Sequence, residues 1–177
     1  MKTKYISACL ATGLLALGAS PSWAESSSAS KLSFSCQDNQ GIPTTVAHKS
    51  SEESALPVFH WKTEALPTSM DAQQLCDRVS AKLEDYSAQG YDLSGFSSAE
   101  QAGLPAICAT DGKNDQCSLV LFTLAPADNP VNMAHGVLST ILDKSLQANK
   151  LVSSDRGVQS FSYQVNFWDM FGLKLIK

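Results

Sequence analysis

The chain has 177 residues, 44 % of them hydrophobic, and its formal net charge at pH 7 is −4. This charge argues against a nucleic-acid-binding protein, because displacing counterions from phosphates requires clustered lysines and arginines. Beyond the N-terminal segment, no stretch of the sequence is long and apolar enough to cross a bilayer.

The first 24 residues are typical of a secretory signal peptide. Two lysines precede an apolar stretch over residues 6–18, and small residues occupy positions −3 and −1 of a cut after Ala24. An uncleaved anchor is the alternative, but the stretch is short and rich in Gly, Ala and Ser for a membrane span. Cleavage between Ala24 and Glu25 would leave 153 residues with a formal charge of −6, a length that suits one domain with a full hydrophobic core.

The mature chain is predicted to begin with a polar spacer and a β-hairpin. The serine-rich residues 25–31 are expected to be disordered. Residues 32–37 alternate between apolar and polar, and residues 42–48 carry β-branched side chains, so both are expected to be strands. Residues 38–41 between them have the composition of a turn. A third short strand is predicted over residues 56–61.

The next segment changes to a helical period. Asp71 stands three residues before Gln74 in a capping-box-like start, and apolar residues recur at helical spacing as far as Tyr86. Gly90 is expected to end this helix. The adjacent acids at positions 84 and 85 are interpreted as solvated rather than as a catalytic dyad.

Three more strands are predicted after the helix, over residues 91–96, 106–110 and 117–124. The last two flank a polar turn and form a hairpin with a cysteine near each base. Residues 117–124 are almost continuously apolar. We therefore expect this strand to be central in its sheet and covered on both faces.

The remaining residues predict a second helix and a final strand. Asn129 is expected to cap the helix, whose apolar stripe extends from Val131 to Leu146. Residues 149–157 are expected to be a loop, and residues 161–167 alternate as a last strand. The order βββ-α-βββ-α-β predicts a single α+β domain with two main helices and a mostly antiparallel sheet.

Four cysteines follow the signal peptide: Cys36, Cys76, Cys108 and Cys117. An even number of cysteines in an exported chain predicts two disulfides, for which four cysteines allow three pairings. A metal site is the competing interpretation. It is disfavoured because there is no CxxC pair and the three histidines stand in separate segments.

Six short motifs are spread over most of the mature chain: F-x-C at 34–36, G-x-P-T-T at 41–45, P-V-x-x-W at 57–61, QQ-x-C at 73–76, P-x-I-C…C…F-T-L at 105–124 and N-P at 129–130. Together they resemble the motifs of the cyanobacterial circadian-oscillating-protein family. The four cysteines stand in register with that pattern, whereas the last strand and the tail match it least.

The resemblance implies a domain of this family over residues 32–177. It also implies an exported cyanobacterial protein of the periplasm or the thylakoid lumen, with peripheral membrane association in some members. In the founding example, abundance is linked to the daily rhythm. The family pattern suggests the pairs Cys36–Cys76 and Cys108–Cys117, and it brings no catalytic residues.

A few residues are candidates for surface contacts. His60 and Trp61 could line a pocket at a strand end, although a lone histidine there is more often structural. Trp168 and Phe171 stand in an apolar tail that could dock on a membrane surface. We favour packing of this tail across the sheet, because exposed apolar termini aggregate. The turn 111–116, between two cysteines, could present itself to a protease as an inhibitory loop.

The sequence therefore predicts a non-enzymatic, exported binding or structural module with no cofactor, no metal and no nucleic-acid partner. An unidentified protein partner and peripheral membrane association are compatible with it, and no oligomeric state is implied. The alternatives are a protease inhibitor and an extracytoplasmic hydrolase. A well-formed pocket that holds His60 with an Asp or Ser within hydrogen-bond reach would rank the hydrolase above the binding module.

Overall fold

The computed structural model describes residues 32–49, 54–111, 117–155 and 158–171. The predicted signal peptide with its cleavage site at Ala24 and Glu25, the spacer 25–31 and most of the 111–116 turn lie outside the described residues. No helix in the described ranges is long and apolar enough to cross a membrane.

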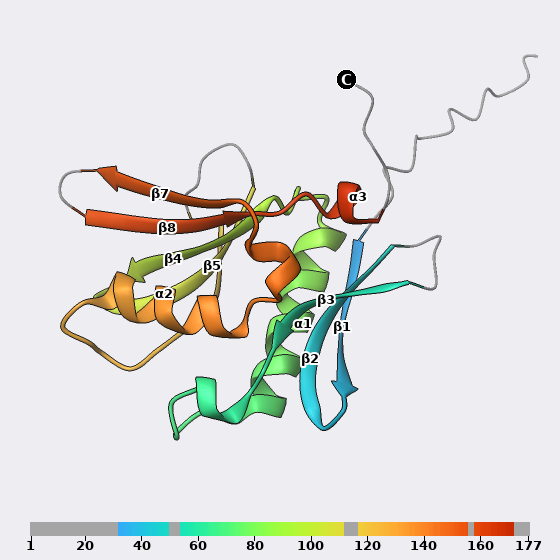
Figure 1. Ribbon diagram of the computed structural model, residues 1–177, viewed down its shortest axis with the longest axis horizontal. Helices are drawn as coiled ribbons and strands as arrows, with labels where there is room; N and C mark the ends of the chain where they lie inside the picture. Colours follow the sequence, from blue (N-terminus) through green and yellow to red (C-terminus); the bar gives the residue numbers. More distant parts are fainter. Residues whose placement is uncertain (1–31, 50–53, 112–116, 156–157, 172–177) are drawn as a thin grey trace, which may run out of the picture.

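Two antiparallel sheets make up the β structure (Figure 1). The first has the order β1-β2-β3 and consists of β1 (Leu32–Asn39), β2 (Ile42–Lys49) and β3 (Ala55–His60). The second has the order β6-β5-β4-β8-β7 and consists of β4 (Gly95–Gln101), β5 (Leu104–Thr110), β6 (Leu119–Thr123), β7 (Lys150–Asp155) and β8 (Val158–Gln164). The fold class is α+β, as predicted, with two sheets rather than one.

The helices are α1 (Ala72–Ala88), α2 (Pro130–Ile141), the short 3-10 helices η1 (Thr63–Ala65) and η2 (Lys144–Gln147), and α3 (Phe167–Met170). Helix α1 packs on β1 and β2 and reaches β6, while α2 packs on β4 and β5. Asp71 and Asn129 cap the two long helices, as expected, by accepting hydrogen bonds from the backbone amides of Gln74 and Asn132.

The β1–β2 hairpin forms because its two-residue loop can take positive φ angles. Gln40 and Gly41 have φ values of 56° and 84°, which suit a tight hairpin turn between twisted strands. The register then pairs Cys36 with Thr45 and turns Phe34 toward the core, where it is buried.

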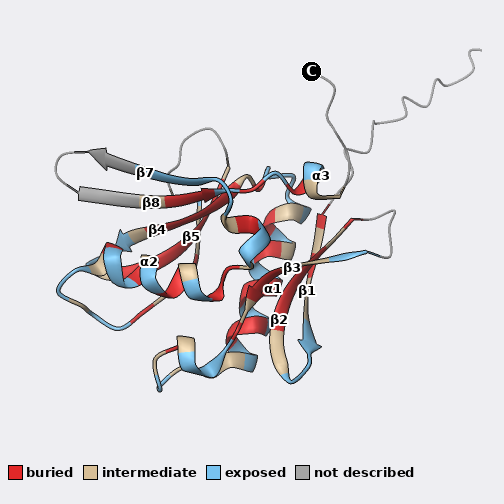
Figure 2. Cartoon of the chain, in the orientation of Figure 1, coloured by how far each residue is buried: buried red, intermediate tan, exposed pale blue. Residues whose placement is uncertain are grey.

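One hydrophobic core is shared by both sheets and both long helices (Figure 2). At its centre Phe59, Trp61 and Phe96 are fully buried. The ring centroids of Phe59 and Phe96 are 4.7 Å apart in an edge-on arrangement, and Trp61 lies 5.6 Å from Phe122 of β6. Because residues of both sheets meet in this cluster, the described chain forms one packing unit.

The two disulfides expected from the sequence are present. Cys36 of β1 bonds to Cys76 of α1, and Cys108 of β5 bonds to Cys117 just before β6. Their Cα–Cα distances are 5.5 and 5.1 Å. This is the pairing that the family resemblance implies. Disulfides of this kind suggest an oxidising, extracytoplasmic environment.

The prediction that the strand at 117–124 is central was wrong. Strand β6 lies at the edge of its sheet, next to β5 only. Its free edge is covered by α1, whose Lys82 Nζ donates to the carbonyl oxygens of Val120 and Leu121 at 3.0 and 2.8 Å. Within β6, Leu121 and Phe122 are buried and the other three residues are half-buried, so an edge strand that contacts a helix can still carry many apolar residues.

Several boundaries also differ from expectation. The predicted strand at 91–96 begins only at Gly95, the second helix ends at Ile141 instead of continuing to Leu146, and the expected loop at 149–157 contains strand β7. Glu84 is not simply solvated, since it is half-buried and accepts a hydrogen bond from the Phe34 amide at 2.6 Å.

Gly95 is a position where a side chain should be costly. It pairs with Gln164 of β8, and an added Cβ would collide with the Tyr163 carbonyl oxygen, a backbone atom. We expect Gly95→Ala to lower the free energy of unfolding by about 1–3 kcal/mol, measured by urea unfolding. Gly136→Ala in α2 is the control, because its Cβ would meet no atom within 4 Å and alanine favours helix. Equal losses in both variants would contradict this explanation.

Candidate functional site

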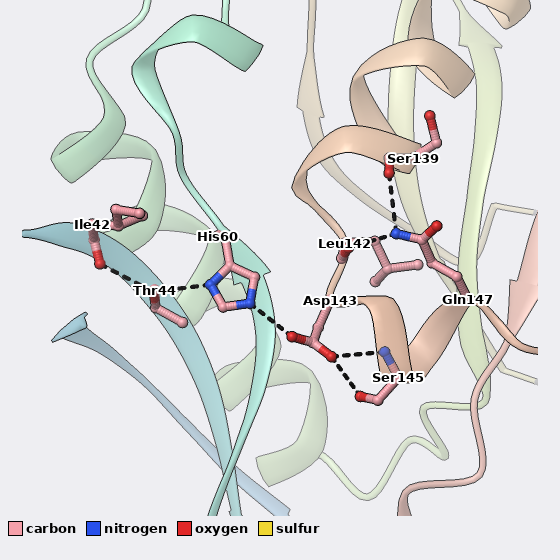
Figure 3. Close-up of polar contacts among 8 residues, drawn as sticks. All are labelled: Ile42, Thr44, His60, Ser139, Leu142, Asp143, Ser145 and Gln147. Atoms are coloured by element: carbon pink, nitrogen blue, oxygen red, sulfur yellow. Dashed lines mark hydrogen bonds and ion pairs between the residues drawn. The ribbon is translucent and has the colours of Figure 1, made fainter. Parts of the chain in front are cut away.

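His60 ends β3 and points toward the joint between α2 and η2 (Figure 3). Its Nε2 atom lies 2.7 Å from Asp143 Oδ2, and its Nδ1 atom lies 3.5 Å from Thr44 Oγ1. The imidazole therefore connects β2, through Thr44, to the joint, through Asp143. The two bonded residues, His60 and Asp143, are 83 positions apart in the chain.

Asp143 is placed by the way α2 ends. Leu142 has extended dihedral angles, φ −63° and ψ 135°, which stop the helix. Asp143 then caps η2 by accepting from the Ser145 amide at 2.8 Å, and its own amide donates to the Val58 carbonyl at 2.9 Å. A bridge between Phe59 and Leu142 adds to this contact. The joint is thus held against the edge of β3 by backbone hydrogen bonds.

The surroundings of Asp143 favour its ionised form. Partial burial on its own would raise the pKa of the carboxyl. Hydrogen bonds from the Ser145 hydroxyl, the His60 imidazole and the Ser145 amide outweigh that effect, and they hold the pKa below its ordinary value of 3.8.

A groove of about 450 Å³ runs beside the pair. Its walls come from the β1–β2 turn on one side and from the end of α2 with η2 on the other, and His60 and Asp143 line it between them. Exposed polar side chains form the rim, among them Gln40, Lys62, Thr140 and Lys144. The groove is therefore concave, with a polar rim and a mixed polar and apolar lining.

The hydroxyl groups near the pair are committed to other contacts. The Thr44 hydroxyl donates to the Ile42 carbonyl at 3.0 Å, and the Thr44 side chain is fully buried. The Ser145 hydroxyl bonds to Asp143 Oδ1, not to the imidazole. Both nitrogens of His60 thus face protein partners, and the hydroxyl next to Nδ1 has no access to the groove.

The other candidate surface residues lie elsewhere. Trp61 is not on the surface as suggested: its ring is fully buried, and its Nε1–H donates to Thr45 Oγ1 at 3.0 Å. The alternation of β3 turns His60 to one face and Trp61 to the other, into the core. Phe171 is half-buried and packs against the core beside fully buried Phe167, in line with a packed tail. The side chain of Trp168 and residues 172–177 lie outside the described residues.

Asp143 and Thr44 were missed as partners of His60, and Ser145 was missed as the partner of Asp143. Asp143-Lys-Ser145 has the composition of a helix N-cap, so a new helical turn could have been recognised inside the predicted second helix. Nothing in the local pattern pairs that turn with β3, because the contact is made by the tertiary fold.

Comparison with known proteins shows the family of this chain. Residues 33–171 match the family model described as circadian oscillating protein COP23. The chain belongs to this family. No curated protein and no solved structure gave a significant match. The COP23 match includes both disulfides and the His60–Asp143 pair. It therefore covers the whole of the groove.

The pair should make the stability of this COP23 domain depend on pH in strong acid. The folded-state pKa of Asp143 lies below 3.8, so the unfolded chain takes up the proton first as pH falls. The stabilising contribution is complete above the ordinary pKa and is lost as pH falls through the folded-state pKa. We expect the free energy of unfolding to decline less steeply in Asp143→Asn than in wild type below about pH 4. Urea unfolding at stepwise pH tests this, and identical slopes would contradict it.

Proposed function

We propose that this COP23-family chain is an exported, non-enzymatic binding module of the periplasm or the thylakoid lumen, and that it binds a protein partner in the His60 groove. The observation that carries the proposal is the engagement of His60. Its Nε2 is held by Asp143 at 2.7 Å and its Nδ1 faces Thr44 at 3.5 Å. With Nε2 bonded to the carboxylate and Nδ1 directed at a buried hydroxyl, the imidazole is not arranged as a free general base.

The His60–Asp143 pair also lacks the accessible hydroxyl that would serve as the nucleophile of a catalytic triad. In a Ser–His–Asp arrangement, the nucleophilic hydroxyl contacts the imidazole nitrogen opposite the carboxylate. That place belongs to Thr44, whose hydroxyl is buried and donates to the Ile42 carbonyl. A buried hydroxyl cannot attack a substrate in the groove.

A structural role explains the His60–Asp143 pair better than a catalytic role does. It ties the end of β3 to the α2–η2 joint, next to the hydrogen bond between the Asp143 amide and the Val58 carbonyl. The groove walls are therefore held in place before any partner arrives, which reduces the ordering cost of binding. Lys62 and Lys144 on its rim are exposed cations in a chain of net charge −4, and they favour a partner that presents acidic side chains.

Affinity capture with matched variants tests this proposal. Tagged mature chain would be crosslinked and recovered from the extracytoplasmic fractions of the source organism as wild type and as Lys62→Glu/Lys144→Glu. The control is Arg78→Glu, an exposed cation of α1 outside the groove. We expect a reproducible partner with wild type and the control, and its recovery to fall about tenfold or more with the groove variant. Recovery of no partner, or equal recovery with the groove variant, would contradict the proposal.

An extracytoplasmic hydrolase is the second candidate, because a groove does hold His60 with an Asp within hydrogen-bond reach. A panel of ester, peptide and phosphoester substrates would be assayed with wild type and His60→Asn. We expect no turnover by either protein. If wild type turned over a substrate and a folded His60→Asn variant did not, the result would contradict the binding-module proposal and support the hydrolase.

A further inference from the structure

A second cavity, of about 600 Å³, opens beside the C-terminal end of α1 and is separate from the His60 groove. Tyr86 and Gln89 of α1, Tyr91 just after the helix and Ser118 before β6 are among its lining residues. The cavity contributes nothing to the function proposed above, and it has two features that a merely structural surface does not explain.

The first feature is an exposed aromatic platform. The rings of Tyr86 and Tyr91 stack with centroids 4.8 Å apart and planes inclined by 21°. Tyr91 is nevertheless 55 % exposed, whereas Tyr86 is only 7 % exposed. Because one face of the Tyr91 ring is covered by Tyr86, the exposed part includes its opposite face. A large apolar ring left open at a cavity is available to a flat apolar face of a ligand.

The second feature is a buried hydroxyl with no partner. The Tyr86 side chain is more than nine-tenths buried, and its hydroxyl has no hydrogen-bond partner among the residues that the structure describes. Burial raises the pKa of Tyr86, and the Ser118 side chain opposes part of this rise because it can form a hydrogen bond to the ionised form. Tyr86 and Ser118 both line the cavity. A buried unpaired polar group calls for an explanation, and a ligand that bonds to it provides one.

The remaining polar groups indicate the chemistry of that ligand. Asp85 and Asp111 each contribute a carboxylate that can only accept hydrogen bonds, and Gln89 contributes an amide that both donates and accepts. The ligand must therefore carry several donors and acceptors. Lys82 lines the same cavity with an ammonium group that already donates to two β6 carbonyls, so the lining carries both signs of charge and does not single out an ionic ligand.

We propose that this cavity binds a neutral saccharide. A sugar ring offers an apolar C–H face for Tyr91, and its hydroxyls both donate and accept, as Asp85, Gln89 and the Tyr86 hydroxyl require. A planar aromatic ligand fits less well. The two tyrosine rings stack on each other and leave no slot between them, and such a ligand would not use the polar rim.

The test is direct binding of the folded mature protein to neutral glycans. A broad array of neutral oligosaccharides would be screened first. Glycans that bind would then be titrated by calorimetry to millimolar concentration, with cellopentaose, maltopentaose and mannopentaose included in every series. We expect saturable binding of at least one neutral glycan by wild type. Binding of no neutral glycan, or of acidic glycans only, would overturn the proposal.

Two variants connect the binding to this cavity. Tyr91→Ala removes an exposed ring and should weaken binding about tenfold. Tyr86→Phe keeps the stack and removes only the hydroxyl, so binding should weaken about fivefold. Its melting temperature should stay equal to or above that of wild type, because no protein hydrogen bond is lost. The control is Met133→Ala, which removes a 48 % exposed apolar side chain on α2. Wild-type affinity in Tyr91→Ala, or a loss as large in Met133→Ala, would overturn the proposal.

Discussion

Replacing Cys36 and Cys76 together by alanine is expected to lower the free energy of unfolding by about 4 kcal/mol. The disulfide joins residues 40 positions apart, so it restricts a long loop in the unfolded chain. The loss is large against a typical total stability of about 5–15 kcal/mol for a domain. Urea unfolding of wild type and the double variant, at equal pH and temperature, measures the difference directly.

The second disulfide supplies the matched control. Cys108 and Cys117 are only 9 positions apart, and their joint replacement by alanine should cost less, about 3 kcal/mol by the same loop-entropy argument. Cys76 and Cys108 are both fully buried, so the two double variants lose similar packing. A larger loss from the short loop than from the long one would contradict the entropic explanation.

Trp61→Ala should destabilise the domain by about 3–5 kcal/mol, the range found when a large buried aromatic side chain is removed. The Trp61 ring is fully buried between Phe59 and Phe122, with centroid distances of 5.5 and 5.6 Å. Its Nε1–H also donates to the hydroxyl oxygen of Thr45, which accepts a second hydrogen bond from Ser80. The variant would lose both the packing and one donor to a buried oxygen.

Trp61→Phe separates these two contributions. It keeps most of the apolar volume and removes the N–H donor, so the loss should be smaller, about 1–2 kcal/mol. If Trp61→Ala instead cost less than about 0.5 kcal/mol, the residue would behave like a surface position. That outcome would contradict the burial described here.

Local rules predicted the hairpins and helix starts well. The β1–β2 hairpin was found from alternation and from a turn that contains Gly41, and the helix starts were found from Asp71 and Asn129. These features depend on interactions within a few residues, such as a cap that bonds an amide three positions on. The helix end at Ile141 was missed because the apolar stripe continues through Leu142 and Leu146, and both are buried.

Strand β7 shows where a local pattern carries too little information. Leu151 and Val152 are adjacent and both exposed, so β7 lacks the alternation that marks a half-buried strand. It forms because its backbone pairs with β8, where Lys150 stands opposite Tyr163. Pairing of this kind depends on the backbone of the neighbouring strand, so the side-chain pattern of β7 does not identify it as a strand.

The sequence by itself determined the fold class, the family, the two disulfides and the starts of both long helices, because short-range spacing and cysteine content carry that information. Only the tertiary structure decided which strand lies at the sheet edge, that Trp61 is buried, and that His60 meets Asp143 across 83 residues. Each of these depends on how separate elements pack against one another. The free energy of such packing belongs to the assembled core and cannot be assigned to a short stretch of chain.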